Sequence, residues 1–105
     1  MPGSSLTVDV ATRPQHVLVT VAGDLDIDTR TDVTQLIDEL PLEGRTLTLD
    51  MSGVTFMDSS GLSLLLDLRR RVEDEGAGLE LAAPSFHTLR VLDLTGTRRL
   101  FTIRP

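Results

Sequence analysis

The residues with the clearest capacity for chemistry are Asp58-Ser59-Ser60-Gly61, a short polar segment between two apolar ones. β-Branched and aromatic residues precede it, and a leucine-rich run with helical spacing follows. The segment is therefore expected where a strand or loop gives way to a helix. A helix N-terminus carries unpartnered backbone N–H groups and the positive end of the helix dipole, so it favours a capping oxygen or an anion.

Two interpretations of this segment are open. In the first, Asp58 or one of the serines only caps the helix that follows. In the second, an exposed serine hydroxyl is a phosphorylation site. A phosphate adds about −1.5 to −2 charge, which a helix N-terminus tolerates, so a binding face would change while the fold persisted.

Enzymatic interpretations fail on the surrounding residues. His87 as a base to Ser59 would suggest a hydrolase, but Met57 occupies the first glycine position of a Gly-x-Ser-x-Gly elbow. Asp26-Ile27-Asp28 after an apolar strand resembles the first motif of haloacid-dehalogenase-type phosphatases. The chain has no lysine and no matching acidic motif, so we expect no catalytic activity.

Metal and cofactor sites are not expected either. A calcium loop beginning at Asp24 would need Gly at its sixth position and Glu at its twelfth, where Thr29 and Gln35 stand. The absence of cysteine excludes disulfides and thiolate metal sites. We assign no cofactor and no metal to the chain.

Length and charge limit the remaining functions. The 105 residues suffice for a single domain, residues 1–105, with one core; residues 1–5 are expected to be disordered. A formal charge of −6 disfavours nucleic-acid binding, and Arg69-Arg70-Arg71 is expected to be a solvated face. No apolar run approaches the roughly 20 residues of a membrane span, and no leader pattern is present. These features predict a cytoplasmic protein without membrane contact.

Strands and helices alternate along the chain after an opening hairpin. The hairpin is expected from residues 6–10 and 17–22, joined by a polar segment in which His16 is expected to be a solvated loop residue. Thr29 followed by Asp32 predicts a capped helix that ends before Pro41. The further elements are expected to be a strand at 46–50, the leucine-rich helix after Gly61, a strand at 79–82, a helix from Pro84 to Gly96 and a strand at 100–103. The predicted class is α/β, with a mixed, mostly parallel sheet and helices packed against it.

Residues 47–62 resemble the signature of STAS-domain anti-sigma-factor antagonists, in which an alternating strand leads through Phe-Met into Asp-Ser-Ser-Gly-Leu. Gly23-Asp24-Leu25-Asp26 is similar to the family's Gly-(Glu/Asp)-Leu-Asp turn, and residues 92–96 are similar to its last helix end. The resemblance covers nearly the whole chain and implies a STAS-like single domain.

The resemblance also implies a function. In such a protein the unphosphorylated form binds an anti-sigma factor that is a serine kinase, and so releases the sigma factor. Phosphorylation at Ser59, with Ser60 as the alternative acceptor, switches binding off, and a serine phosphatase restores it. The implied partner-binding residues are Asp24, Asp26, Ile27, Asp58, Ser59, Ser60, Gly61 and Leu62.

A scaffold without a phospho-switch, acting as a subunit of a signalling complex, is the alternative. Family members usually continue into another helix after the last strand, whereas this sequence stops at Pro105. Uncovered apolar surface would favour self-association, so a weak homodimer is also expected.

Overall fold

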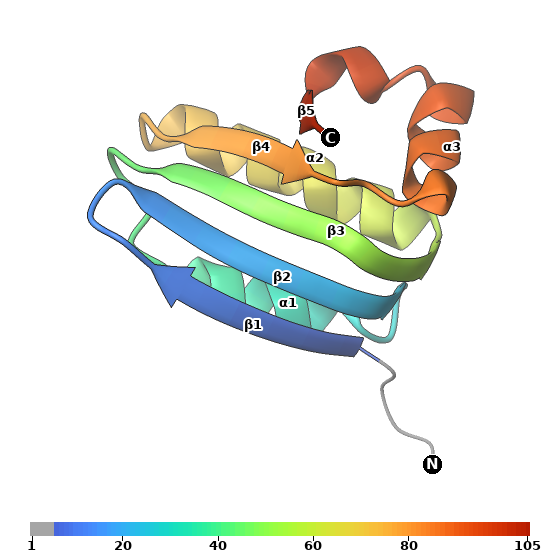
Figure 1. The fold of residues 1–105 in the computed structure, drawn as a ribbon, viewed down its shortest axis with the longest axis horizontal. Helices are drawn as coiled ribbons and strands as arrows, with labels where there is room; N and C mark the ends of the chain where they lie inside the picture. The colour runs from blue at the N-terminus through green and yellow to red at the C-terminus, as the bar shows by residue number, and fades with distance from the viewer. Residues whose placement is uncertain (1–5) are drawn as a thin grey trace.

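Alternating apolar residues build the strands of one mixed sheet, and two helices cover one of its faces (Figure 1). The structure is a computed structural model that describes residues 6–105, so the disorder predicted for residues 1–5 lies outside the described residues. The described elements are β1 (Leu6–Thr12), β2 (His16–Leu25), α1 (Arg30–Asp38), β3 (Thr46–Met57), α2 (Ser59–Asp74), β4 (Gly78–Ala82), α3 (Phe86–Thr95), a 3-10 turn (Arg98–Leu100) and β5 (Thr102–Arg104).

The strands lie in the sheet in the same order as in the sequence, from β1 to β5. β1 and β2 form an antiparallel hairpin in which Val10 faces Val19. The pairs from β2 to β5 are parallel, with β3 in the middle of the sheet. The predicted hairpin and the mostly parallel α/β sheet are confirmed.

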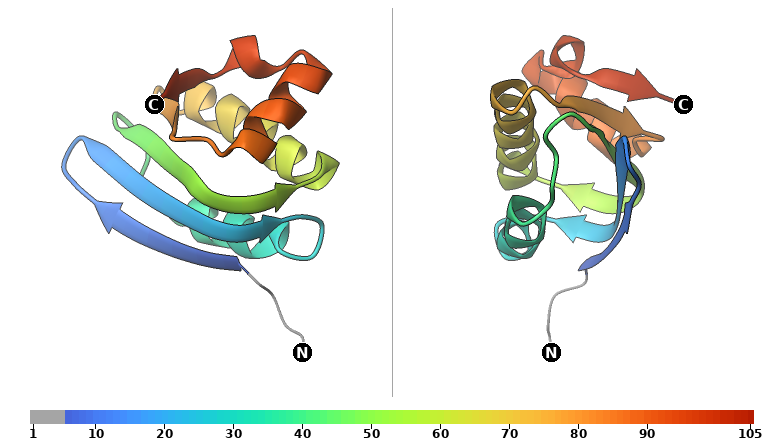
Figure 2. Two further views of the ribbon diagram at one scale, coloured as in Figure 1. Left: turned by 45° about the vertical axis from the view of Figure 1, so that its right-hand side comes forward. Right: turned by 90° about the vertical axis from the view of Figure 1, so that its left-hand side faces the viewer.

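Helices α1 and α2 pack side by side on one face of the sheet, as both views in Figure 2 show. α1 buries Val33 and Ile37 against the sheet. α2 buries a leucine-rich face, and the alternate residues of β2 and β3 meet both helices. The strand residues of this core include Val17, Val19, Val21, Leu47, Leu49 and Met51; α2 supplies Leu64, Leu65, Leu68 and Val72.

The other face of the sheet carries a row of polar contacts. The His16 ring nitrogen Nε2 lies 2.5 Å from the Thr48 hydroxyl, which donates to the Glu80 carboxylate at 3.3 Å. Arg104 pairs with the same carboxylate at 3.1 Å. The prediction that His16 is a solvated loop residue is wrong, because β2 begins at His16 and the register sets it beside β3.

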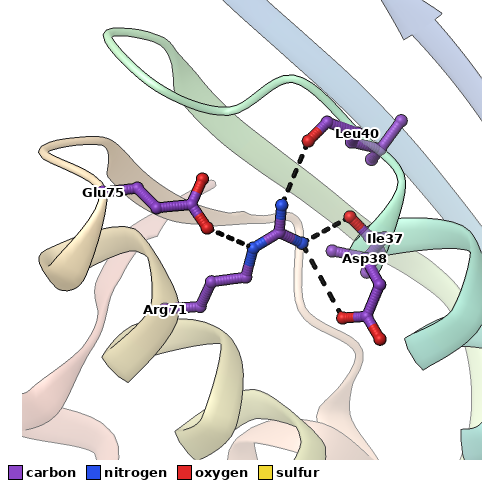
Figure 3. Close-up of polar contacts among 5 residues, drawn as sticks. All are labelled: Ile37, Asp38, Leu40, Arg71 and Glu75. Atoms are coloured by element: carbon purple, nitrogen blue, oxygen red, sulfur yellow. Dashed lines mark hydrogen bonds and ion pairs between the residues drawn. The ribbon is translucent and has the colours of Figure 1, made fainter.

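Arg71 of α2 forms hydrogen bonds with the backbone at the C-terminal end of α1 (Figure 3). Its guanidinium donates to the backbone carbonyls of Ile37 and Leu40 and pairs with Glu75 at 2.7 Å, with Asp38 3.9 Å away. α1 has no basic residue in its own last turn. A cation from the neighbouring helix therefore adds a charged donor at the negative end of α1, where the Ile37 carbonyl also accepts from Leu40 N at 3.0 Å.

Several predicted element ends differ in the structure. β2 runs on to Leu25 and β3 to Met57, past the predicted residues 22 and 50. α1 begins at Arg30, directly after Thr29 as predicted, but the Thr29 side chain makes no capping bond to it. Ser85 caps α3 and accepts from Thr88 N at 3.3 Å, so Pro84 lies outside the helix. The final strand starts only at Thr102, because residues 98–100 form the 3-10 turn. Gly96 ends α3 as predicted, with the positive φ of 71° that glycine adopts without strain.

Candidate functional site

Asp58 holds the junction between β3 and α2. Its backbone is extended, and its Oδ1 accepts hydrogen bonds from Ser60 N at 2.8 Å and from Gly61 N at 3.4 Å. Its own N–H donates to the carbonyl of Leu25 at 3.4 Å, which fixes the end of β3 against the end of β2. Asp58, and neither Ser59 nor Ser60, is therefore the N-cap of α2.

Because Asp58 is the N-cap of α2, neither serine hydroxyl caps the helix. Ser59 is the first residue of α2 and is exposed; Ser60 is half-buried. Within residues 6–105, neither hydroxyl has a hydrogen-bond partner. An exposed hydroxyl at a helix N-terminus is accessible to a modifying enzyme, and the helix dipole favours an anion there.

Gly61 brings α2 close to the end of β2. A Cβ atom at this position would lie 2.5 Å from Met57 Cγ and 2.8 Å from the carbonyl oxygen of Leu25. No other residue fits without a shift of backbone. Gly61 is buried, so it positions the segment that carries Ser59 and offers little surface to a partner.

The turn between β2 and α1 begins directly after Leu25 and is held by its own polar groups. Asp26 Oδ1 accepts from the N–H groups of Asp28 at 3.0 Å and Thr29 at 3.1 Å. The Thr29 hydroxyl is buried; it donates to the Asp24 carbonyl at 2.7 Å and accepts from Asp26 N at 3.0 Å. The contacts of Leu25 with Asp58 and Gly61 therefore set this ordered turn beside the start of α2.

The surface around this junction combines carboxylates with exposed apolar groups. The Asp24 carboxylate accepts from the Thr55 hydroxyl at 2.9 Å. Ile27, at the tip of the turn, is 69% exposed, and Phe56 is 42% exposed. Leu62 packs partly against the core. Acidic groups and apolar side chains in one exposed area are typical of a protein-binding surface more than of a reaction centre.

His87 lies on the other side of the β3 end. Its Nε2 is 3.2 Å from the carbonyl oxygen of Met57, and its ring lies against Phe56 with centroids 5.3 Å apart. His87 therefore bonds to the backbone before the junction and makes no bond to Ser59. The described residues contain no cluster of three or more His, Cys, Asp or Glu that could hold a metal ion.

A comparison with protein-family models matches residues 8–103 to the family described as Mlab, STAS domain. The match covers most of the chain. This protein belongs to the STAS-domain family. The resemblance predicted from residues 23–26, 47–62 and 92–96 is thereby confirmed, as is the predicted fold.

Individual relatives are similar along most of their length. The anti-sigma-B factor antagonist of Bacillus subtilis is 26% identical over 99 residues, which are 94% of this chain and 91% of that protein. The crystal structure of an anti-sigma factor antagonist from Mycobacterium paratuberculosis has 29% identity and a TM-score of 0.80, over 96% of this chain and 86% of that one. Unphosphorylated SpoIIAA, an anti-sigma factor antagonist, shares the fold, with a TM-score of 0.71 and 21% identity over 94% of this chain and 89% of that one.

The STAS domain thus brings together most of the predicted site residues and adds others. Asp24, Asp26, Ile27, Asp58, Ser59 and Ser60 lie around the ends of β2 and β3. Sequence reasoning missed Thr29, Thr55 and His87 as neighbours that hold this area. Only Thr55 could have been found, because strand alternation in 54–57 sets it on the exposed face. No helix of the described chain is long and apolar enough to cross a membrane.

Proposed function

We propose that this STAS domain is an anti-sigma factor antagonist that works as a binding switch. In the unphosphorylated state it binds an anti-sigma factor that is also a serine kinase, and the sigma factor is released for transcription. The observation that carries the proposal is the exposed Ser59 at a capped helix start, with a hydroxyl that bonds to no other described residue. The names of the relatives support the anti-sigma factor as partner.

Modification transfers the γ-phosphoryl group of ATP to Ser59. The Ser59 oxygen forms the new P–O bond, the bond to the ADP oxygen breaks, and the hydroxyl proton leaves to a base of the kinase. ATP is bound by the kinase and is not a cofactor of this chain. A serine phosphatase hydrolyses the phosphoester and restores the hydroxyl.

The phosphate acts on the surface and leaves the fold in place. It adds about −1.5 to −2 charge next to Asp58 and near the turn that carries Asp24 and Asp26. A partner that approaches this surface closely would have to desolvate that charge. Losing a close charged contact in an interface costs about 2–5 kcal/mol, enough to end useful binding.

Ser60 is the alternative acceptor. Its hydroxyl is half-buried, whereas that of Ser59 is exposed, so Ser59 offers easier access to a kinase. Asp58 keeps the helix start ordered through its bonds to Ser60 N and Gly61 N whichever serine is modified.

The phosphorylation step is tested with the purified protein, ATP and cell extract of the source organism, followed by mass spectrometry of the peptides. Wild type and Ser60→Ala are expected to acquire one phosphate on Ser59, and Ser59→Ala none. Phosphate found only on Ser60 would move the switch to that residue. No phosphate on either serine, in an extract that phosphorylates other proteins, would favour the scaffold alternative.

Partner binding is tested by capture with wild type, Ser59→Asp and Ser63→Asp. Ser63 is exposed on the same face of α2, one turn further on, so its variant adds the same charge about 5–6 Å from the proposed acceptor and tests whether the effect is confined to Ser59. A kinase-type ATPase retained by wild type and Ser63→Asp but lost by Ser59→Asp supports the switch. Equal capture by all three baits would support a STAS scaffold indifferent to Ser59. The cytoplasm is the expected compartment, because the kinase, ATP and the sigma factor act there.

A further inference from the structure

The outward face of α3 is a groove with apolar walls. Phe86 is 80% exposed and Leu94 is 75% exposed, and both lie on one side of the helix, two turns apart. With Leu89 they line a groove of about 320 Å³ whose rim carries Arg90 and Arg98. Two large apolar side chains this exposed on one helix face mark a contact surface rather than ordinary scatter.

The groove is also the basic part of an acidic protein. Residues 86–104 carry four arginines and one aspartate, whereas the rest of the sequence carries six arginines and fifteen acidic residues. Asp93 pairs with Arg98 at 3.2 Å. Arg90 is exposed and has no ion-pair partner between residues 6 and 105, so its charge is available to an incoming carboxylate.

The complementary surface is on the same chain, at the tip of the β2–α1 turn. Ile27 projects there with 69% of its surface exposed, between Asp26 and Asp28. The carboxylate of Asp26 is used inside the turn, but Asp28 is exposed and its carboxylate has no bond to any residue from 6 to 105. The tip therefore presents one apolar side chain with one free negative charge beside it.

We propose that the groove on α3 receives the Ile27 tip of a second copy of this chain, with Asp28 of one protomer facing Arg90 of the other. The apolar side chain matches the apolar walls, and the free carboxylate matches the free guanidinium. Figures 1 and 2 place the β2–α1 turn and α3 at the same end of the molecule, where β2 and β3 finish. A twofold axis at this end makes each contact twice and closes the assembly at a dimer.

The contact is small, so the dimer is weak and depends on concentration. One side chain and one ion pair per half, even doubled, fall in the range of transient interfaces below roughly 1,200 Å². Ile27 also belongs to the surface proposed for the kinase, so self-association competes with that partner. The proposal does not depend on the phospho-switch, because it is tested with the protein alone.

The first experiment is sedimentation of the wild-type protein over a wide concentration range. A monomer–dimer equilibrium with no larger species is expected. Ile27→Asp and Leu94→Asp are each expected to weaken the dimer at least about tenfold, which is the loss of 1.4 kcal/mol. Both side chains are exposed, so both variants keep the fold, which circular dichroism verifies. A monomer at every concentration, or an open series of larger species, overturns the proposal.

A charge exchange tests the pairing itself. Asp28→Arg alone and Arg90→Asp alone place like charges together and are expected to remain monomeric. The double variant, and an equimolar mixture of the two single variants, bring opposite charges together again and are expected to dimerise. Glu43→Arg changes the net charge by the same amount as Asp28→Arg, in the α1–β3 connection at the other end of the sheet, and should dimerise like wild type. Failure of both exchanged combinations to recover the dimer overturns the pairing.

Discussion

At the scale of single residues, Gly61 shows how tightly the start of α2 is fitted to the sheet. The Leu25 carbonyl is part of the backbone and cannot move aside as a side chain end can. The methyl group of Gly61→Ala would cost about 1–3 kcal/mol as overpacking, more than the gain of up to about 1 kcal/mol from better helix propensity. We expect the variant to be less stable than wild type in urea unfolding.

Ser63→Ala provides the control for that substitution. Ser63 is exposed in the same helix, so its change should alter the free energy of unfolding by no more than about 0.5 kcal/mol. A Gly61→Ala protein as stable as this control would falsify the close approach.

Asp58 gives a second prediction at this scale. Asp58→Ala removes the acceptor for Ser60 N and Gly61 N and should cost about 1 kcal/mol of unfolding free energy. Asp58→Asn removes the charge but keeps a capping oxygen, so it should cost clearly less. If the two variants unfold at the same urea concentration, the charge and not the cap stabilises the junction.

Thr29 marks the limit of what the sequence predicts about single side chains. The pattern of Thr29 and Asp32 is typical of a capping box. In the structure the Thr29 hydroxyl donates to the Asp24 carbonyl, and Asp26 takes the place of Asp32 as the acceptor for Thr29 N. The turn at residues 24–29 folds back on itself in a way that the Thr-x-x-Asp pattern does not encode.

At the scale of elements, periodicity predicted the helices and strands well and their ends less well. Val33 and Ile37 of α1 are core residues, as are the leucines spaced along one face of α2, which the sequence predicted. α1 ends before Pro41 as predicted, but Arg71, more than thirty residues away in α2, bonds to carbonyls at this end. A contact across that separation leaves no pattern within α1 itself.

Arg71 therefore carries the prediction at this scale. Arg71→Met leaves the carbonyls of Ile37 and Leu40 without a charged donor and should lower the free energy of unfolding by about 1.5–3 kcal/mol. Arg71→Lys should recover only part of the loss, because the compact ammonium lacks the planar, spread donors with which the guanidinium reaches both carbonyls and Glu75. Urea unfolding measures both.

The adjacent arginine is the matched control for this series. Arg70 is exposed and makes no ion pair with another described residue, so Arg70→Met should be nearly neutral. If Arg70→Met lowers the free energy of unfolding as much as Arg71→Met does, the role given to Arg71 is contradicted.

At the scale of the whole molecule, the switch surface is separate from the parts that hold the fold. Ser59 is exposed, and its neighbours Asp58 and Gly61 carry the contacts to β2. Ser59→Asp adds a carboxylate at the positive end of α2, which should raise the free energy of unfolding by about 0.3–1 kcal/mol or leave it unchanged.

Thermal and urea unfolding of Ser59→Asp beside Ser63→Asp check this separation. The carboxylate introduced by Ser63→Asp lies one turn further from the N-terminus of α2, so it should raise the free energy of unfolding by less. A Ser59→Asp protein destabilised by more than about 1 kcal/mol would mean that the serine supports the fold as well as the surface.

The strand order has a consequence for how the protein is made. Because the order in the sheet is the order in the sequence, each strand that leaves the ribosome finds its neighbour already synthesised. Contacts between consecutive elements close short stretches of chain, which favours fast folding. Each new strand can therefore pair with the strand made just before it, and the sheet can form from β1 toward β5 during synthesis. Only the most recently added strand is then left with an unpaired edge on the growing side.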